Sequence, residues 1–228
     1  MTRDWHSTQN VDYMLLAKRR LNQPPLIWVQ QFAEIINLVV PTLPTRFNTD
    51  RRELLINDIG CNVGHFYRCL TQIDYPVSYC GYDVSQTYLR IAKDFFPGVD
   101  FFELDISTDT PRLADITVIS ATLEHIRDHE RAIMNIFTTT RFAVLLRTFI
   151  GDESVVEYCR TDDALSDYLI KQFTLFDVTL FGLSNGWKFE LFLDQATGGV
   201  PKLVCNRRSI ARSQKIIVFK RGVDVSGK

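Results

Sequence analysis

Three acidic residues, Asp58, Asp83 and Asp105, come at the ends of three successive apolar segments. Each segment has the length of a β-strand, and the carboxyl ends of parallel strands meet at one edge of a sheet. We therefore expect the three side chains to border one ligand site. Carboxylates accept hydrogen bonds from hydroxyl and ammonium groups, so the pattern favours a ligand that carries such groups.

The turn that contains the first of these acids also contains two glycines, Gly60 and Gly64. Glycines let the backbone approach a ligand that lies at the start of the following helix. A dinucleotide fingerprint beginning at Gly60 would need glycines at two positions that hold Asn62 and His65. Asp58 would also repel a pyrophosphate but would suit an ammonium and a sulfonium. The charge of the turn thus favours S-adenosylmethionine over NAD.

The two later acids have different expected partners on a nucleoside. Asp83 lies one strand-and-helix unit beyond the glycine turn and can accept both ribose hydroxyls. Asp105 and the adjacent backbone amide of Ile106 can form hydrogen bonds with the edge of an adenine. The three acids together predict a site for an adenosine-type ligand.

The elements that must position these residues alternate along the chain. Apolar periodicity predicts strands at residues 54–56, 77–82, 99–104, 116–120 and 142–147, and helices at 66–73, 85–97 and 131–137. Alternating strands and helices imply a parallel, doubly wound α/β sheet.

The two ends of the chain have other patterns. The first fifty residues predict two amphipathic helices, in which Tyr13, Trp28 and Phe32 could line an acceptor pocket as a lid. Residues 161–173 have a helical pattern, and 175–184 fit a helix or a strand. Strands at 187–194 and 215–220 predict an antiparallel hairpin at the sheet edge. We expect one domain, with a helical cap at 1–50, a cofactor-binding core at 51–150, and an acceptor-side insert with the hairpin at 151–228.

These residues resemble the class I S-adenosylmethionine-dependent methyltransferases, in particular the small-molecule group with a Leu-Glu-His-Ile turn after the fourth strand. The resemblance is carried by the glycine turn, by Asp83, by Asp105-Ile106 and by the segment from Ser120 to Asp128. It implies a seven-stranded, mostly parallel Rossmann-like sheet. By this resemblance the residues that bind the cofactor are Asp58, Gly60, Cys61, Asn62, Gly64, Asp83, Val84, Asp105, Ile106 and Ser120.

The resemblance also implies an in-line transfer of a methyl group from S-adenosylmethionine to a nucleophilic atom, with S-adenosylhomocysteine as product. The segment after the fourth strand would face the methyl group, so His125 is the candidate base. Glu124, Asp128 and His129 could orient it. An enzyme of this kind works mainly by holding donor and acceptor close together and away from water.

Charge and sequence motifs limit the chemical class of the methyl acceptor. The formal net charge is -1, so no general positive field attracts nucleic acid. The segment from Ser120 lacks the Asn/Asp-Pro-Pro-Tyr/Phe sequence used to methylate exocyclic amines of bases. We therefore expect a small-molecule acceptor, methylated on oxygen or nitrogen, with no nucleic-acid partner. A homodimer is left open.

Composition also bears on metal binding and localisation. The five cysteines form no Cys-x-x-Cys pair, so we expect no metal site. The first residues contain no apolar run typical of a signal peptide, and no segment is long and apolar enough to span a membrane. We therefore expect a cytoplasmic protein without a membrane partner.

One alternative from another functional class stays open at this stage. A methyltransferase-like core could serve assembly or sense the cofactor without catalysis, because a fold does not determine a function. A pocket over His125 would favour an enzyme, whereas a filled pocket with exposed apolar patches would favour a scaffold.

Overall fold

The computed structural model describes residues 11–43, 53–160, 167–203 and 211–221. The strands are β1 (Leu54–Ile59), β2 (Val77–Asp83), β3 (Asp100–Glu103), β4 (Ala114–Ser120), β5 (Thr140–Ile150), β6 (Val155–Arg160), β7 (Asp167–Gln172), β8 (Trp187–Leu193), β9 (Lys202–Leu203) and β10 (Ala211–Arg221). The α-helices are α1 (Val11–Leu21), α2 (Ile27–Val39), α4 (Gln86–Phe95), α5 (His129–Thr138) and α6 (Leu175–Ser184). Three 3-10 helices are η2 (Val40–Thr42), η3 (Phe66–Gln72) and η4 (Leu123–His125).

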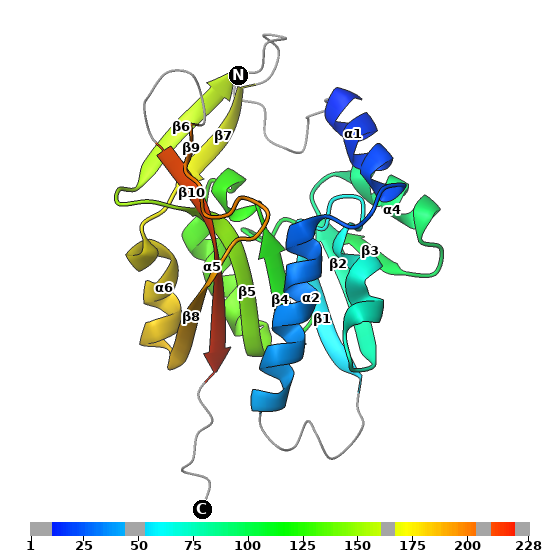
Figure 1. Cartoon of the computed structure of the whole chain (residues 1–228), viewed down its shortest axis with the longest axis horizontal. Helices are drawn as coiled ribbons and strands as arrows, with labels where there is room; N and C mark the ends of the chain where they lie inside the picture. The colour runs from blue at the N-terminus through cyan, green and yellow to red at the C-terminus, as the bar shows by residue number, and fades with distance from the viewer. Residues whose placement is uncertain (1–10, 44–52, 161–166, 204–210, 222–228) are drawn as a thin grey trace, which may run out of the picture.

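The main sheet follows the order β3-β2-β1-β4-β5-β10-β8, and β9 pairs with β10 (Figure 1). Strands β1 to β5 are parallel to their neighbours, whereas β10 is antiparallel to both β5 and β8. The predicted Rossmann-like sheet with an antiparallel edge hairpin is therefore confirmed. Because the chain moves outward from β1 to β3 and then crosses to β4, the strand order reverses beside β1, which is where such sheets bind ligands.

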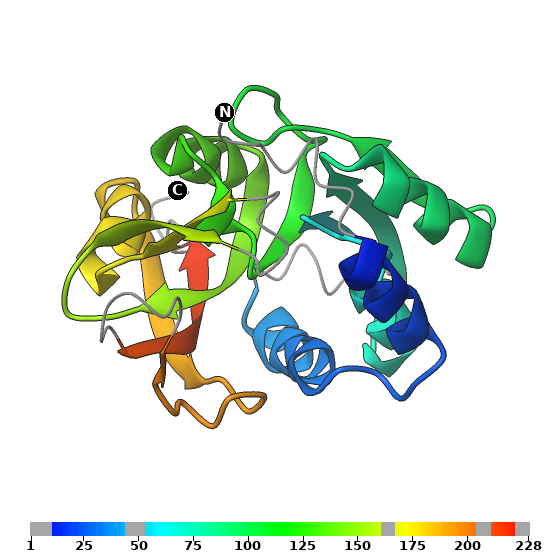
Figure 2. The same cartoon turned by 90° about the horizontal axis from the view of Figure 1, so that it is seen from above.

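Helices cover both faces of the sheet, as Figure 2 shows from above. One core cluster joins α2, η3 and α4 to one face, and a second joins α5 and α6 to the other. Strand β5 supplies both clusters alternately: Ala143 and Leu145 face α2, while Val144 and Leu146 face α5. This period of two is the physical reason why the central strands are apolar throughout.

Most of the predicted elements are present. The two N-terminal helices, the five parallel strands and both edge strands are confirmed, and residues 175–184 form a helix. Ser85 caps α4 by accepting a hydrogen bond from the backbone N–H of Tyr88, as its sequence position predicts. The predicted helix at 66–73 is of the 3-10 type, closed by bonds such as Ile73 N–H to the Leu70 carbonyl.

The helix predicted at residues 161–173 is wrong over the part that the structure describes. Residues 167–172 form β7, which pairs with β6 along its whole length; residues 161–166 lie outside the described residues. The segment satisfies its backbone groups through β6, a strand that the sequence pattern did not predict. The aromatic and branched residues Tyr168 and Ile170 also favour a strand, and this signal was outweighed by apparent helical periodicity.

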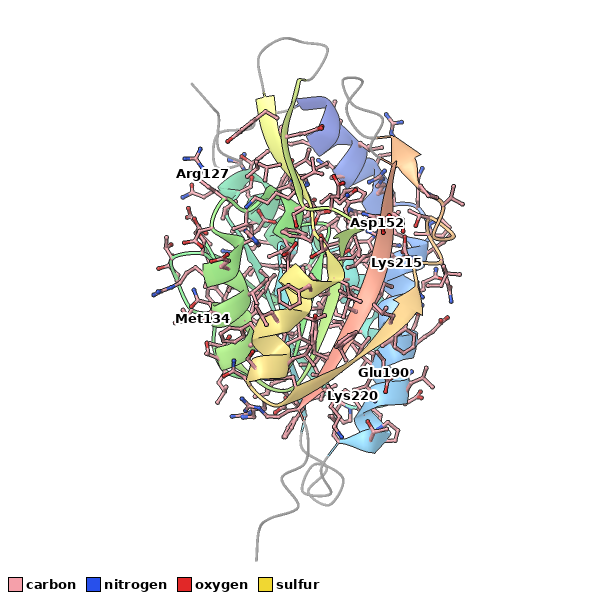
Figure 3. The ribbon with its side chains drawn as sticks, turned by 90° about the vertical axis from the view of Figure 1, so that its left-hand side faces the viewer. Arg127, Met134, Asp152, Glu190, Lys215 and Lys220 are labelled. Atoms are coloured by element: carbon pink, nitrogen blue, oxygen red, sulfur yellow. The ribbon has the colours of Figure 1, made fainter. Side chains whose placement is uncertain are left out.

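The β6–β7 hairpin lies above the carboxyl ends of the parallel strands, beyond the edge of the main sheet (Figure 1). Figure 3 shows Arg127 toward this end of the molecule, and Glu190 and Lys220 at the opposite end. The latter two form an ion pair of 2.5 Å between β8 and β10. Among the described residues, no helix has the length and apolar character that a membrane crossing requires.

The turn after β1 depends on Gly60. Its φ is +71°, and a Cβ placed on it would lie 2.1 Å from Thr122 Oγ1. The turn therefore needs both the left-handed backbone and the absence of a side chain, so that it can pack against the segment after β4.

We expect Gly60→Ala to destabilise the protein more than Gly98→Ala does. Gly98 also has a positive φ, +84°, but a Cβ there would contact nothing within 4 Å. Gly98→Ala should cost about 1 kcal/mol of unfolding free energy, and Gly60→Ala at least about 2 kcal/mol more, because Thr122 must move. Urea unfolding of both variants measures this, and equal losses would contradict the packing role of Gly60.

Candidate functional site

One large cavity, of about 520 Å³, lies at the carboxyl ends of the parallel strands. Its wall includes nearly every residue that the sequence predicted for the site: Asp58, Gly60, Cys61, Asn62, Asp83, Val84, Asp105, Ile106, Ser120 and His125. Gly64 is the exception. A Cβ on Gly64 would lie 3.0 Å from the rings of Phe96 and Phe101, so this glycine permits packing beneath the cavity.

Asp58 is a buried carboxyl group at the end of β1. Its Oδ2 accepts a hydrogen bond of 2.7 Å from the Tyr79 hydroxyl. Burial raises the pKa of Asp58 to about 7, although the Tyr79 hydrogen bond lowers it and the charge of Asp83 raises it. A carboxyl group with so little water around it is poised to pair with a ligand cation, which would restore its ionised form.

The Asp83 carboxylate is aligned by the backbone of the two neighbouring turns. Its Oδ2 accepts a 2.8 Å bond from the Asn62 N–H, and its Oδ1 accepts a 2.9 Å bond from the Ser85 N–H. Asn62 has a φ of +53°, and its own Oδ1 accepts from the Val63 N–H at 2.8 Å. Asparagine tolerates this left-handed conformation better than most residues, so the turn keeps its shape without a glycine at this position.

Asp105 and Ile106 close the cavity beside β3. Asp105 Oδ1 accepts bonds from the backbone N–H and the hydroxyl of Ser107, at 2.9 and 2.6 Å. Asn135 on α5 donates to the Ile106 carbonyl at 2.8 Å. The loop after β3 is therefore tied to a helix on the far face of the sheet, which fixes the position of the Ile106 backbone at the cavity wall.

His125 lies in η4, directly after β4, and its ring is held by the β6–β7 hairpin. The distance from its Nδ1 to the carbonyl oxygen of Leu169 on β7 is 2.7 Å. A carbonyl can only accept, so Nδ1 carries a proton, and in the neutral ring Nε2 is then the basic nitrogen. The hairpin thus sets the tautomer that a general base requires.

The neighbours proposed to orient His125 have defined partners of their own. Glu124 is fully buried and accepts a 2.9 Å bond from the Thr148 hydroxyl; burial is the main cause of its raised pKa. Asp128 caps α5 through the Arg131 N–H. His129 Nδ1 lies 2.9 Å from Lys171 Nζ.

Lys171 is a second link between the hairpin and the loop after β4. This buried lysine on β7 also donates to the Arg127 carbonyl at 2.6 Å. Burial is the main cause of the lowered pKa of both Lys171 and His129, and their mutual proximity lowers that of His129 further. Two side chains therefore tie the hairpin to residues 125–129, one through His125 and the other through Lys171.

Several cavity residues were not predicted from the sequence. Arg147 from β5 is the most prominent, because this buried cation lines the cavity beside Trp28. His65 also lines it; burial lowers the pKa of this ring to about 4, followed by the charges of Arg20 and Arg68. No sequence motif marks these residues. Of the residues predicted to form a lid, Trp28 lines the cavity, whereas Phe32 is fully buried in the core beneath α2, so its assignment to the pocket is wrong. The side chain of Tyr13 lies outside the described part of the chain.

The N-terminal helices close the cavity. Ala17 and Leu21 of α1 pack on Val63 and Tyr88, which belong to the glycine turn and to α4. Arg20 and Trp28 reach the cavity wall from this helical layer. Within the described ranges, no group of His, Cys, Asp and Glu side chains has the arrangement needed to hold a metal ion.

Comparison with known proteins finds one family that matches the central part of the chain. Residues 57–141 match the family described as "Methyltransferase domain". These residues contain the glycine turn, the strand-end acids and His125. No curated protein has a sequence that matches the chain.

Many solved structures share the fold. An amino pentose methyltransferase, CalS10, from Micromonospora echinaspora has a TM-score of 0.61 at 13% identity, over 94% of this chain and 98% of its own. A TehB-like S-adenosylmethionine-dependent methyltransferase from Corynebacterium glutamicum has a TM-score of 0.58 at 15% identity, over 93% and 100%. Magnesium protoporphyrin IX methyltransferase from Synechocystis, solved with bound S-adenosylhomocysteine, has a TM-score of 0.50 at 14% identity, over 86% and 84%. These structures confirm the predicted fold, and the match over residues 57–141 confirms that this part of the chain resembles a methyltransferase domain.

The environment of Asp58 predicts a specific pH dependence of stability. Burial raises its pKa to about 7 in the folded chain, against 3.8 for an ordinary exposed carboxyl. Between these two pKa values the folded state holds a proton that the unfolded state has lost. The free energy of unfolding therefore falls as pH rises from about 4 toward 7. Asp58→Asn should remove this loss. The difference in unfolding free energy between the variant and the wild type should shift in favour of the variant by on the order of 2 kcal/mol from pH 5 to pH 7.5.

Urea unfolding of both proteins, without ligand, at pH 5 and pH 7.5 measures this difference. A gap that stays constant between the two pH values would show that Asp58 titrates as an ordinary surface carboxyl.

Proposed function

We propose that this S-adenosylmethionine-dependent methyltransferase acts on a small molecule, which it methylates on oxygen or nitrogen. One observation carries the proposal: the acids at the ends of β1, β2 and β3 line the same cavity as His125 at the end of β4. The cavity, about 520 Å³, is within the size range of small-molecule sites. Unfilled space beside His125 supports an enzyme over a scaffold that has lost its acceptor pocket.

The residues of the cavity fit S-adenosylmethionine by charge and hydrogen bonding. Asp58, whose pKa is raised by burial, would pair with the ammonium group of the cofactor, because that cation would stabilise the ionised carboxylate. Asp83, aligned by two backbone N–H groups, would accept the ribose hydroxyls. Asp105 and Ile106 would border the adenine. When bound, the cofactor supplies a methyl group on a positively charged sulfur.

The chain itself would contribute position and one proton acceptor. The helical layer and the sheet wall the cavity, so a bound ligand would displace water from it, which strengthens its electrostatic interactions. His125 Nε2, basic because Nδ1 donates to Leu169, would take the proton that an acceptor hydroxyl or amine releases as its lone pair bonds to carbon. Since a thioether leaves readily, no acid on the leaving side is required.

Two variants should distinguish the residue that binds the ribose of the cofactor from the residue that binds its amino-acid end. We expect S-adenosylhomocysteine to bind with a micromolar Kd, or about -8 kcal/mol. Asp83→Ala should weaken S-adenosylhomocysteine and 5'-methylthioadenosine alike, by about tenfold or more, because both carry the ribose. Asp58→Asn should weaken only S-adenosylhomocysteine, because methylthioadenosine lacks the amino-acid end. Isothermal titration calorimetry measures the affinity of each ligand for the wild type and for both variants.

Asp94→Ala, an exposed acid on α4, is the matched control and should bind both ligands as the wild type does. Asp83→Asn serves as a second variant at the ribose position, because it retains an acceptor for one backbone N–H. Unchanged affinity in both Asp83 variants would refute the ribose assignment, and absence of S-adenosylhomocysteine binding to the wild type would refute the proposed function.

His125→Ala should keep the affinity for S-adenosylhomocysteine within about threefold but slow turnover by about 100-fold or more. His125→Asn is the informative partner, because its amide can still donate to the Leu169 carbonyl but cannot act as a base. Turnover is measured as S-adenosylhomocysteine release over pH 6 to 9, with an acceptor found by screening hydroxyl and amine compounds. Full activity of His125→Asn would show that the histidine only positions its loop.

A further inference from the structure

Arg147 is a buried cation in the cavity that the methyl-transfer mechanism does not use. It lies in the carboxyl-terminal half of β5, and its side chain is 7% exposed. Its Cζ lies 5.7 Å from the ring centroid of Trp28, so the guanidinium and the indole form one wall of the cavity. Burying a guanidinium costs free energy, and partners are required to offset that cost.

The partners of Arg147 fix the plane of its guanidinium. Nε and Nη2 donate to the two carboxylate oxygens of the fully buried Asp194, at 2.9 and 3.2 Å. Nη2 also donates to Gln214 Oε1. Burial raises the pKa of Asp194, but hydrogen bonds from Arg147 and Thr197 outweigh this and hold it below its ordinary value. The pair stays ionised, and the fork cannot rotate.

The third nitrogen of the fork faces a different neighbour. Nη1 lies 3.5 Å from Ser120 Oγ, at the limit of a hydrogen bond, and Ser120 itself lines the cavity. A guanidinium held on one edge and presented on the other is the arrangement by which arginine recognises oxygen anions. The Ser120 hydroxyl provides a second donor beside it.

The cavity wall carries charges of both signs, including Arg20 from α1 and Asp128 beside Arg127, but the strands contribute acids on one side and a cation on the other. The acids Asp58, Asp83 and Asp105 lie at the ends of β1, β2 and β3, whereas Arg147 comes from β5, on the far side of β4. Arg127, an exposed residue in the cavity wall, adds a second positive charge on the side of the loop after β4. If the cofactor occupies the acidic side, as the proposed function requires, the acceptor lies on the side of Arg147.

We propose that Arg147, together with Ser120, holds an acidic oxygen group of the methyl acceptor, a carboxylate or a phosphate-type group. This inference rests on the proposed function and adds the substrate class to it. A neutral analogue would leave the fixed N–H groups without a strong acceptor in a cavity shielded from water, so the site should discriminate against it. Asp194 is then a positioning residue, which keeps the guanidinium in place when no acceptor is bound.

Binding of simple probes to the protein saturated with S-adenosylhomocysteine tests the inference. Benzoate, phenylphosphonate, benzamide and benzylamine share a ring and differ in charge. Ligand-observed NMR titration should show at least one acid binding tenfold or more tighter than benzamide, with benzylamine weakest. Tighter binding of benzoate would assign a carboxylate, and tighter binding of phenylphosphonate a phosphate-type group.

Three variants locate the effect. Arg147→Gln should abolish the preference for acids, and so should the double variant Arg147→Gln/Asp194→Asn, which leaves no unpaired buried charge. S-adenosylhomocysteine affinity within threefold of the wild type shows that each variant is folded. Arg141→Gln is the matched control, because Arg141 lies on the same strand but pairs with Asp115 away from the cavity, at 2.9 Å; it should keep the preference.

Two outcomes would overturn the inference: acids that bind the wild type no better than benzamide, or a preference that survives in both Arg147 variants. Failure of the proposed function would be visible separately, as absence of S-adenosylhomocysteine binding to the wild type. In that case the same titration of the unliganded protein would still decide the role of Arg147.

Discussion

The site depends on a carboxyl group that the fold keeps away from water. Asp58 ends the central strand β1, is 6% exposed, and has one hydrogen bond from Tyr79. In the absence of a cation this arrangement favours the neutral acid, which is why its pKa rises to about 7. The same desolvation strengthens any interaction with a ligand cation. The protein thus gives up stability at neutral pH for a strong electrostatic contact at the place where the strand order reverses.

The sequence could predict this half of the site because its determinants are local. Asp58, Asp83 and Asp105 each lie within two residues of the end of a strand, and parallel pairing then brings the strand ends together without further information. The glycine turn is also local: Gly60 and Asn62 have positive φ values that their residue types allow. The alternation of strands and helices fixed the topology, so nearly all the predicted residues lie at one cavity.

The rest of the site depends on contacts between distant parts of the chain. In the sequence, Arg147 is an ordinary basic residue at the end of an apolar strand. Its role becomes visible only in the fold, where it pairs with Asp194, 47 residues later. The β6–β7 hairpin was misread because the residues around Lys171 have an apparent helical pattern, whereas their conformation is set by β6 and by the loop after β4. Even the tautomer of His125 depends on a backbone carbonyl 44 residues away. Such pairings leave no local signal in a single sequence.

The structure also suggests why the hairpin is linked to the site by two different side chains. Through Leu169 it sets the basic nitrogen of His125, and through Lys171 it holds the Arg127 carbonyl in the same loop. A loop that carried the base without these links would be free to rotate the ring away from the cavity. Because β7 also connects to β5 through the Ile150–Phe173 bridge, the hairpin is anchored to the strand that carries Arg147. His125, the proposed base, and Arg147, the proposed acceptor anchor, are therefore positioned by one continuous piece of structure. If both proposals hold, a change in the hairpin would alter proton transfer and acceptor selection together.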